Sequence, residues 1–317
     1  MEYIIPNIKV NFSKIDEKNL IKSDNLPYLV KLGFNNYYSD NIKKLYDPKY
    51  EVKIRRQFKG KYKQYKISQP YNYTIQKNSQ IDGDDKYDTI EEAFEKKYKY
   101  SSKKQDFYKL WEVITKYKVL GKNNYVNDEY GKKIIEIYKK SESDKSYDAL
   151  ILNNHIKLNV SQEKMYDDII LDNVKLIKSL NNGGNMVLKL YTLYTQFTND
   201  LIVLLSQMFK KSIIYIPHAV ETYRNEKYLV LLDYKPDKNI LSLIDKMNGS
   251  YLSLNLENID DYNKFVKELN LTESLKQAKA INSMEKYIKN NNYFGDDYEL
   301  YYKDAREKSN EWIKEFI

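Results

Sequence analysis

The sequence contains no cysteine and only two histidines among its 317 residues. Without thiols the chain has neither disulfide bonds nor thiolate metal sites, which suits a reducing compartment. Two histidines, His155 and His218, are too few for a histidine-rich metal site, so we expect no metal. In its loop before Glu226, His218 is expected to be ordinary polar surface.

Long apolar runs are also missing. No stretch approaches the ~20 apolar residues that cross a bilayer, so we expect no membrane-spanning segment. Residues 1–12 lack a basic region followed by an apolar one, so we expect no signal peptide. The hydrophobic fraction of 42% is nevertheless enough for a buried core, in one large domain or two small ones.

Lysine, asparagine, isoleucine and tyrosine are abundant instead, and the tyrosines number 33. All four residue types have AT-rich codons, so much of this bias can reflect the genome and not the chemistry. The net charge of +8 favours a polyanionic partner such as RNA, although a solvated basic surface explains it equally well.

A dense basic segment lies in the first third of the chain. Its cations are Lys53, Arg55, Arg56, Lys59, Lys61, Lys63 and Lys66. The aromatic residues between them are Phe58, Tyr62 and Tyr65. Single-stranded RNA is bound by this combination, because cations contact phosphates and rings stack on bases. A solvated hairpin is the alternative, and the sequence leaves both interpretations open.

The texture of the sequence predicts three parts. Residues 1–104 form a mixed, basic N-terminal extension, residues 105–240 alternate helix and strand patterns, and residues 241–317 are helical. The helical part is expected to begin with one helix near 259–269 and a second, with Leu275 inward, near 275–288. A third, from Leu300 to Ile317, is expected to expose Trp312 and Phe316 at its end.

The middle part carries the pattern of an α/β sheet. Four apolar runs are predicted to be buried strands, at 147–152, 186–190, 212–216 and 227–232. Helices are expected from Asp106, over 165–180 and over 199–211. The segment 181–184 (NNGG) is expected to stop the second helix. Because only ten residues join the last two strands, they are predicted to form an antiparallel hairpin at the edge of a parallel sheet.

Three short motifs resemble the FtsJ/RrmJ-type cap 2′-O-methyltransferases. They are Phe107–Glu112 (FYKLWE), Gly183–Lys189 (GGNMVLK) and Pro217–Tyr228 (PHAVETYRNEKY). The resemblance implies a Rossmann-like methyltransferase sheet and a Lys-Asp-Lys-Glu tetrad, in which one lysine deprotonates a ribose 2′-hydroxyl and its neighbours tune the pKa of that lysine. It places Lys109, Lys189 and Glu226 at three tetrad positions, with Lys189 as the base.

The sequence departs from that family at decisive points. The tetrad acid is replaced by an amide at about Asn153 or Asn154, and Val220-Glu221 replaces the family's Ser-Arg. Between Leu120 and Asp148 there is no G-x-G turn to approach a nucleoside. At normal element lengths that interval is expected not to hold two strands, their helices and a ribose-binding acid. The sheet is therefore expected to be truncated, with no S-adenosylmethionine bound by this chain.

The losses resemble those of the poxvirus mRNA capping enzyme small subunits. Leu26–Leu29, Phe34–Tyr38 and Val187–Tyr194 carry that resemblance. It implies a non-catalytic regulatory subunit, with Lys109, Asn153, Lys189 and Glu226 as vestigial tetrad positions. The expected partner is the large catalytic subunit of the capping enzyme, whose guanine-N7 methyltransferase would bind the cofactor and be stimulated. The resemblance also implies a viral protein located in the host cytoplasm and the virion.

Two other functions stay open. An active cap 2′-O-methyltransferase with a divergent cofactor site would use Lys109, Lys189 and Glu226 as catalytic residues. An RNA-binding module would use the basic segment from Lys53 to Lys66, with affinity that falls steeply with salt.

Overall fold

The computed structural model describes residues 1–8, 21–22, 89–143, 145–153, 173–190, 193, 196–220, 226–246, 252–253, 259–289 and 296–317. The chain divides into two compact units that interleave along the sequence. The first comprises residues 1–46, 117–216 and 226–272, and the second comprises 47–116, 217–225 and 273–317. The three-part division predicted at residues 104 and 240 rests on sequence texture and stays a prediction.

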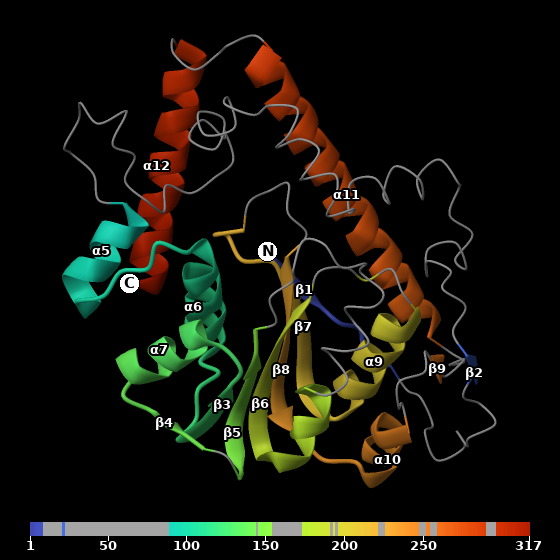
Figure 1. The fold of residues 1–317 in the computed structure, drawn as a ribbon. Coiled ribbons are helices and arrows are strands. Elements are labelled where there is room, and N and C mark those ends of the chain that lie inside the picture. Colours follow the sequence, from blue (N-terminus) through green and yellow to red (C-terminus); the bar gives the residue numbers. More distant parts are fainter. Residues whose placement is uncertain are drawn as a thin grey trace. The chain divides into compact units, whose positions relative to one another are not determined.

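A seven-stranded mixed sheet forms the centre of the first unit (Figure 1). Its strand order is β1-β7-β8-β6-β5-β3-β4. The strands are β1 (Glu2–Ile4), β3 (Asn123–Val126), β4 (Ser141–Glu142), β5 (Tyr147–Leu152), β6 (Leu180–Leu190), β7 (Phe209–Tyr215) and β8 (Lys227–Tyr234). Strands β4, β3, β5 and β6 run parallel, whereas β8 is antiparallel to β6 and β7. The predicted α/β class and antiparallel hairpin are confirmed, and β1 is added outside the hairpin.

The helices of the first unit cover the sheet because the central strands are apolar on both faces. They are α7 (Glu129–Ile137), the 3-10 helix η3 (Lys175–Ser179), α9 (Gln196–Gln207), α10 (Lys238–Lys246) and the first part of α11 (Asp260–Lys289). Leu150, Leu188 and Leu229 pack with apolar residues of α9 and α10 in one core cluster. Since successive strand residues alternate, Lys189 and Tyr228 point to the opposite face. A second, two-stranded sheet pairs β2 (Ile21–Lys22) with β9 (Leu252–Ser253).

Two predicted boundaries in the first unit are wrong. Residues 181–184 do not stop a helix but lie inside β6, where Gly183 has φ of 79°. The register between β5 and β6 shifts there, from Tyr147 opposite Leu180 to Ala149 opposite Asn185. A glycine with positive φ is found in β-bulges as well as at helix ends. The NNGG segment was therefore interpreted as a helix end, whereas its glycine lies at an irregularity of the strand. Likewise α9 ends at Gln207, and β7 begins at Phe209.

The interval between Leu120 and Asp148 holds more structure than the sequence predicted. Strands β3 and β4 and helix α7 all lie within it. They fit because β3 has four residues and β4 has two, whereas the prediction assumed strands of about five to six. The front of the sheet is therefore shortened but present.

The second unit is helical in the part that the structure describes. It contains α5 (Ile90–Tyr98), α6 (Gln105–Tyr117, of which the last residue belongs to the first unit), the end of α11 and α12 (Asp296–Phe316). Residues 259–288 belong to one helix, α11, where two were predicted, and Leu275, predicted to face inward, is 57% exposed. Trp312 and Phe316, predicted to be exposed, are both buried. They pack on α6, where the Trp111 indole N–H donates to the backbone oxygen of Phe316 at 2.9 Å.

Among the described residues, every helix is too short or too polar to span a lipid bilayer.

Asp148 ties the amino ends of three strands together. Its Oδ2 accepts the backbone N–H groups of Lys122 and Asn123 at 3.1 and 2.9 Å, and its Oδ1 accepts Asn181 Nδ2 at 2.8 Å. The N–H of Asn123 and the amide of Asn181 lower the pKa of Asp148. Gly121 is required beside it, because a Cβ at that position would lie 2.2 Å from the Cβ of Asp148.

Replacing Asp148 by asparagine is expected to remove an acid-sensitive part of the stability. A carboxyl with a depressed folded pKa stabilises the fold above the unfolded pKa, about 4, and loses this contribution as pH falls through the folded pKa. In urea unfolding, the free energy of unfolding of wild type should therefore exceed that of Asp148→Asn at pH 7, and the difference should be smaller at pH 3. Asp245→Asn removes an exposed partner of Lys178 and serves as the control, with a smaller gap at pH 7. Equal gaps for the two variants would contradict this role of Asp148.

Candidate functional site

The candidate site lies where three parallel strands end and the antiparallel strand begins. Asn127 and Asp128 follow β3, Asn153 follows β5, and Lys189 is the last residue but one of β6. Glu226 directly precedes β8. In open α/β sheets, ligands bind outside the carboxyl ends of the parallel strands. The fold thus places Lys189, Asn153 and Glu226 at the edge of the sheet where ligands of such folds bind.

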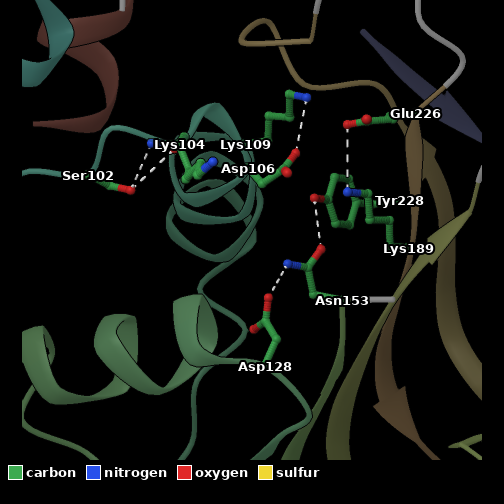
Figure 2. Close-up of polar contacts among 9 residues, drawn as sticks. All are labelled: Ser102, Lys104, Asp106, Lys109, Asp128, Asn153, Lys189, Glu226 and Tyr228. Carbon is green, nitrogen blue, oxygen red and sulfur yellow. Dashed lines mark hydrogen bonds and ion pairs between the residues drawn. The ribbon is translucent and has the colours of Figure 1, made fainter. Parts of the chain in front are cut away.

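Asn153, which the resemblance predicts at or next to the position of the tetrad acid, holds a network of side chains (Figure 2). Its Nδ2 donates to Asp128 Oδ2 at 2.5 Å, and its Oδ1 accepts the hydroxyl of Tyr228 at 3.2 Å. Its backbone N–H donates to Asn127 Oδ1 at 2.8 Å. Because Asn153 is 1% exposed, this is a buried network in which the amide uses both a donor and an acceptor. A carboxylate at this position could not donate to Asp128.

Lys189 and Glu226 form a buried ion pair beside that network. The Lys189 Nζ lies 3.6 Å from Glu226 Oε2, with side-chain exposures of 1% and 8%. Lys189 is also the register partner of Tyr228 across β6 and β8, so the pair and the Asn153 network meet at one cross-strand position. The fold thus brings together the second lysine and the glutamate of the predicted tetrad.

The turn after β3 is held by side-chain hydrogen bonds. Asp128 Oδ1 accepts the backbone N–H of Gly131 at 2.8 Å and caps α7. Gly131 is needed for packing, because a Cβ there would lie 2.9 Å from the side chain of Val126. S-adenosylmethionine sites on this fold need a glycine-rich turn in which the backbone approaches the nucleoside. Between Val126 and Gly131 the chain reads NDEY, and the side chains of Asn127 and Asp128 accept backbone N–H groups of Asn153 and Gly131. That this chain binds no S-adenosylmethionine stays a prediction.

One acidic residue lies at the end of the second strand of this interval, where none was expected from the sequence. Glu142 is the last residue of β4, and it lies opposite Asn124 in the register with β3. Its side chain is exposed. A ribose-binding acid would stand at the end of this strand, and it was not predicted because β3 and β4 are shorter than ordinary strands.

The first tetrad lysine lies in the second unit and is described there by itself. Lys109 of α6 is fully buried, and its Nζ lies 3.2 Å from Asp106 Oδ1 (Figure 2). The assignment of Lys109 as the first lysine of the tetrad therefore stays a prediction.

Two further residues of that unit, Glu112 and His218, are in contact with each other. Glu112, the last residue of the FYKLWE motif, is fully buried and accepts the backbone N–H of His218 at 2.6 Å. The side chain of His218 is largely exposed, in line with its expected place in a polar loop. Partial burial nevertheless lowers the pKa of His218, while the Glu112 carboxylate acts in the opposite direction.

Several predicted residues lie outside the described part of the chain. These are Asn154, His155 and the RNA-binding candidates Lys53, Arg55, Arg56, Lys59, Lys61 and Lys63. Their roles stay predictions. In the described residues, no group of three or more His, Cys, Asp or Glu side chains is placed to hold a metal ion.

Sequence reasoning missed Asp128 and Tyr228, which hold Asn153 from two sides. Asp128 comes two residues after the apolar end of β3, where a helix-capping acid is common. Tyr228 is part of the PHAVETYRNEKY segment, and its register partner is the predicted base. Both signals were present in the sequence, but β3 itself was not predicted.

No family model matches this chain. An uncharacterized protein of Acanthamoeba polyphaga mimivirus is 26% identical to it over 232 residues, which are 66% of this chain and 65% of that protein. The cap-specific mRNA (nucleoside-2′-O-)-methyltransferase 1 of Dictyostelium discoideum is 27% identical over 139 residues, 40% of this chain and 18% of the relative.

The cap-specific mRNA (nucleoside-2′-O-)-methyltransferase 2 of Danio rerio is 33% identical over 72 residues, 23% of this chain and 10% of the relative. The chain thus spans under two thirds of the viral relative and less than a fifth of either methyltransferase. By sequence the chain is distantly similar to cap-specific mRNA 2′-O-methyltransferases and to a viral protein. Its mixed α/β sheet is consistent with a methyltransferase-like fold.

Proposed function

We propose that this chain is a non-catalytic regulatory subunit of a viral mRNA capping enzyme. In this proposal it forms a heterodimer with the large catalytic subunit and stimulates the guanine-N7 methyltransferase of that subunit. It would act in the host cytoplasm and the virion, as the resemblance to the poxvirus small subunits implies. The similarity to cap-specific methyltransferases and to a viral protein supports the setting.

One observation carries the proposal: Asn153, which the resemblance aligns with the tetrad acid, is an amide whose side-chain N–H donates to Asp128. A neutral amide supplies no negative charge to hold a lysine base and orient it. The side chains of Asn127 and Asp128, in the turn after β3, hydrogen-bond to the protein, which also supports the proposal. In that case S-adenosylmethionine would be bound by the partner. Lys189 and Glu226 would persist as a buried structural pair.

Stimulation would require that this chain bind the active state of the methyltransferase more tightly than its idle state. A permanent heterodimer of this kind would bury on the order of 2,000 Å² or more. Direct contact with RNA, through the basic segment from Lys53 to Lys66, is compatible with this role.

The direct test is co-expression with the large capping subunit from the same genome, followed by a cap guanine-N7 methylation assay with and without this chain. The proposal expects the two chains to co-purify and the rate to rise at least tenfold, a coupling of about 1.4 kcal/mol. Co-purification without stimulation, or no complex at all, would remove the regulatory role.

An active cap 2′-O-methyltransferase is the second candidate. The intact Lys189–Glu226 pair and the acid Glu142 after β4 favour it. Isothermal titration of the isolated chain with S-adenosylmethionine separates the two. The regulatory proposal expects no binding tighter than about 1 mM, whereas micromolar binding would favour the enzyme.

A further inference from the structure

Glu112 is a buried carboxylate of the second unit to which the proposed function gives no role. It lies in α6 at the end of the FYKLWE motif and is fully buried. A buried carboxylate is costly unless hydrogen-bond donors surround it. The donors around Glu112 therefore indicate what the side chain is for.

Three N–H groups from two distant segments converge on this carboxylate. The backbone N–H groups of His218 and Ala219 donate to its Oε1 and Oε2 at 2.6 and 3.1 Å. The indole N–H of Trp312, in α12, donates to Oε2 at 2.7 Å. The two shorter distances lie at the short end for N–H groups that donate to a carboxylate, and such charge-assisted hydrogen bonds are the strong ones.

The arrangement has the form of an anion site. Successive backbone N–H groups that point to one acceptor make a concavity for anions, and here an indole N–H completes it. We infer that the loop from Pro217 to Val220 and the helix α12 form a carboxylate-binding site, and that Glu112 is its resident ligand. The charge of Glu112 thereby holds loop 217–220 and the end of α12 on α6.

Neighbouring contacts support this assignment within the same unit. The Pro217 backbone oxygen accepts the N–H of Val220 at 3.1 Å, so the loop is a turn that directs its inner N–H groups to one side. The indole of Trp111 donates to the Phe316 oxygen, which fixes α12 a second time next to Trp312. Trp111 and Trp312 are the two tryptophans of the sequence, so fluorescence excited at wavelengths that tyrosine does not absorb reports on this cluster.

The experiment empties the site and refills it with a small anion. In the full chain, Glu112→Ala is expected to lower Tm by about 5–10 °C, because buried N–H groups lose their acceptor. Sodium formate at 0.2 M should recover at least half of that loss and restore the tryptophan emission maximum. Sodium chloride and formamide, matched in concentration, should not.

The isosteric variant Glu112→Gln tests whether charge or shape matters, and it serves if Glu112→Ala does not fold. Its amide turns a donor toward the converging N–H groups, so amide hydrogen exchange at residues 218 and 219 should speed up at least tenfold. Trp312→Phe, which keeps the ring and removes one donor, should give a smaller change at those amides. Wild-type exchange in Glu112→Gln, or equal effects of formate on wild type and Glu112→Ala, would overturn the assignment.

Discussion

Replacing Glu226 by alanine is expected to lower the free energy of unfolding by about 3 kcal/mol. The pair that it forms with Lys189 is almost completely buried, at 1% and 8% side-chain exposure. Removing Glu226 takes away the carboxylate that faces the buried ammonium group of Lys189, and removing one partner of a buried ion pair is strongly destabilising. Urea unfolding at pH 7, followed by circular dichroism, measures the difference.

The exposed pair between Lys133 and Glu136 gives a matched control. Its atoms lie 2.8 Å apart, closer than those of the buried pair, but Glu136 is 69% exposed. Glu136→Ala should therefore cost less than about 1 kcal/mol. The double variant Lys189→Met with Glu226→Leu should recover most of the loss, because apolar replacement of both partners removes the unpaired charge. Equal losses for Glu226→Ala and Glu136→Ala would contradict this account of the pair.

This result bears on function because a stabilising pair is retained whether or not catalysis is. Lys109, Lys189 and Glu226 match the family motifs, and the retention of these three residues is the best sequence evidence for an active enzyme. If the pair contributes to folding, its presence no longer distinguishes a regulatory subunit from an active methyltransferase. The discriminating position is then Asn153, where charge and not packing differs between the two functions.

The fold was predictable where strands are apolar and long. β5, β6, β7 and β8 contain runs of apolar residues buried on both faces, which the sequence displays directly. β3 was not predicted because its sequence, NNYV, begins with two polar residues. Asn124 is nevertheless fully buried there, since its Nδ2 donates to the Ser141 oxygen at 3.0 Å and its Oδ1 accepts the Gly121 N–H at 2.9 Å. Composition cannot show that a polar side chain will be satisfied by a distant backbone.

The site was predictable where spacing along one segment sets it. Lys189, Asn153 and Glu226 were placed from motifs, but their surroundings depend on which strands are neighbours. Tyr228 reaches Asn153 because β8 pairs with β6 and β6 pairs with β5. The burial of Trp312 was missed for the same reason, since an apolar stripe near the end of a helix does not tell which element covers it.

Replacing Asn153 by aspartate, which restores the family residue, is expected to destabilise the protein by about 3 kcal/mol at pH 7. The new carboxylate would face Asp128 Oδ2, which Asn153 Nδ2 now contacts at 2.5 Å. Two carboxylates this close cannot both ionise freely, so the pKa of the introduced group is raised. A raised folded pKa gives stability that is lost as pH rises, so the deficit should be small near pH 4 and grow toward neutrality.

Exchanging the two side chains provides the control for that prediction. In the double variant Asp128→Asn with Asn153→Asp, an amide again donates to a carboxylate, and asparagine still caps α7 as well as aspartate does. The free energy of unfolding should return to within about 1 kcal/mol of wild type at pH 7, because one amide again faces one carboxylate. If Asn153→Asp alone is as stable as wild type from pH 4 to 8, the amide does not bind Asp128 as described. The case against an acid at this position would then fail, and the cap 2′-O-methyltransferase would become the better account of the chain.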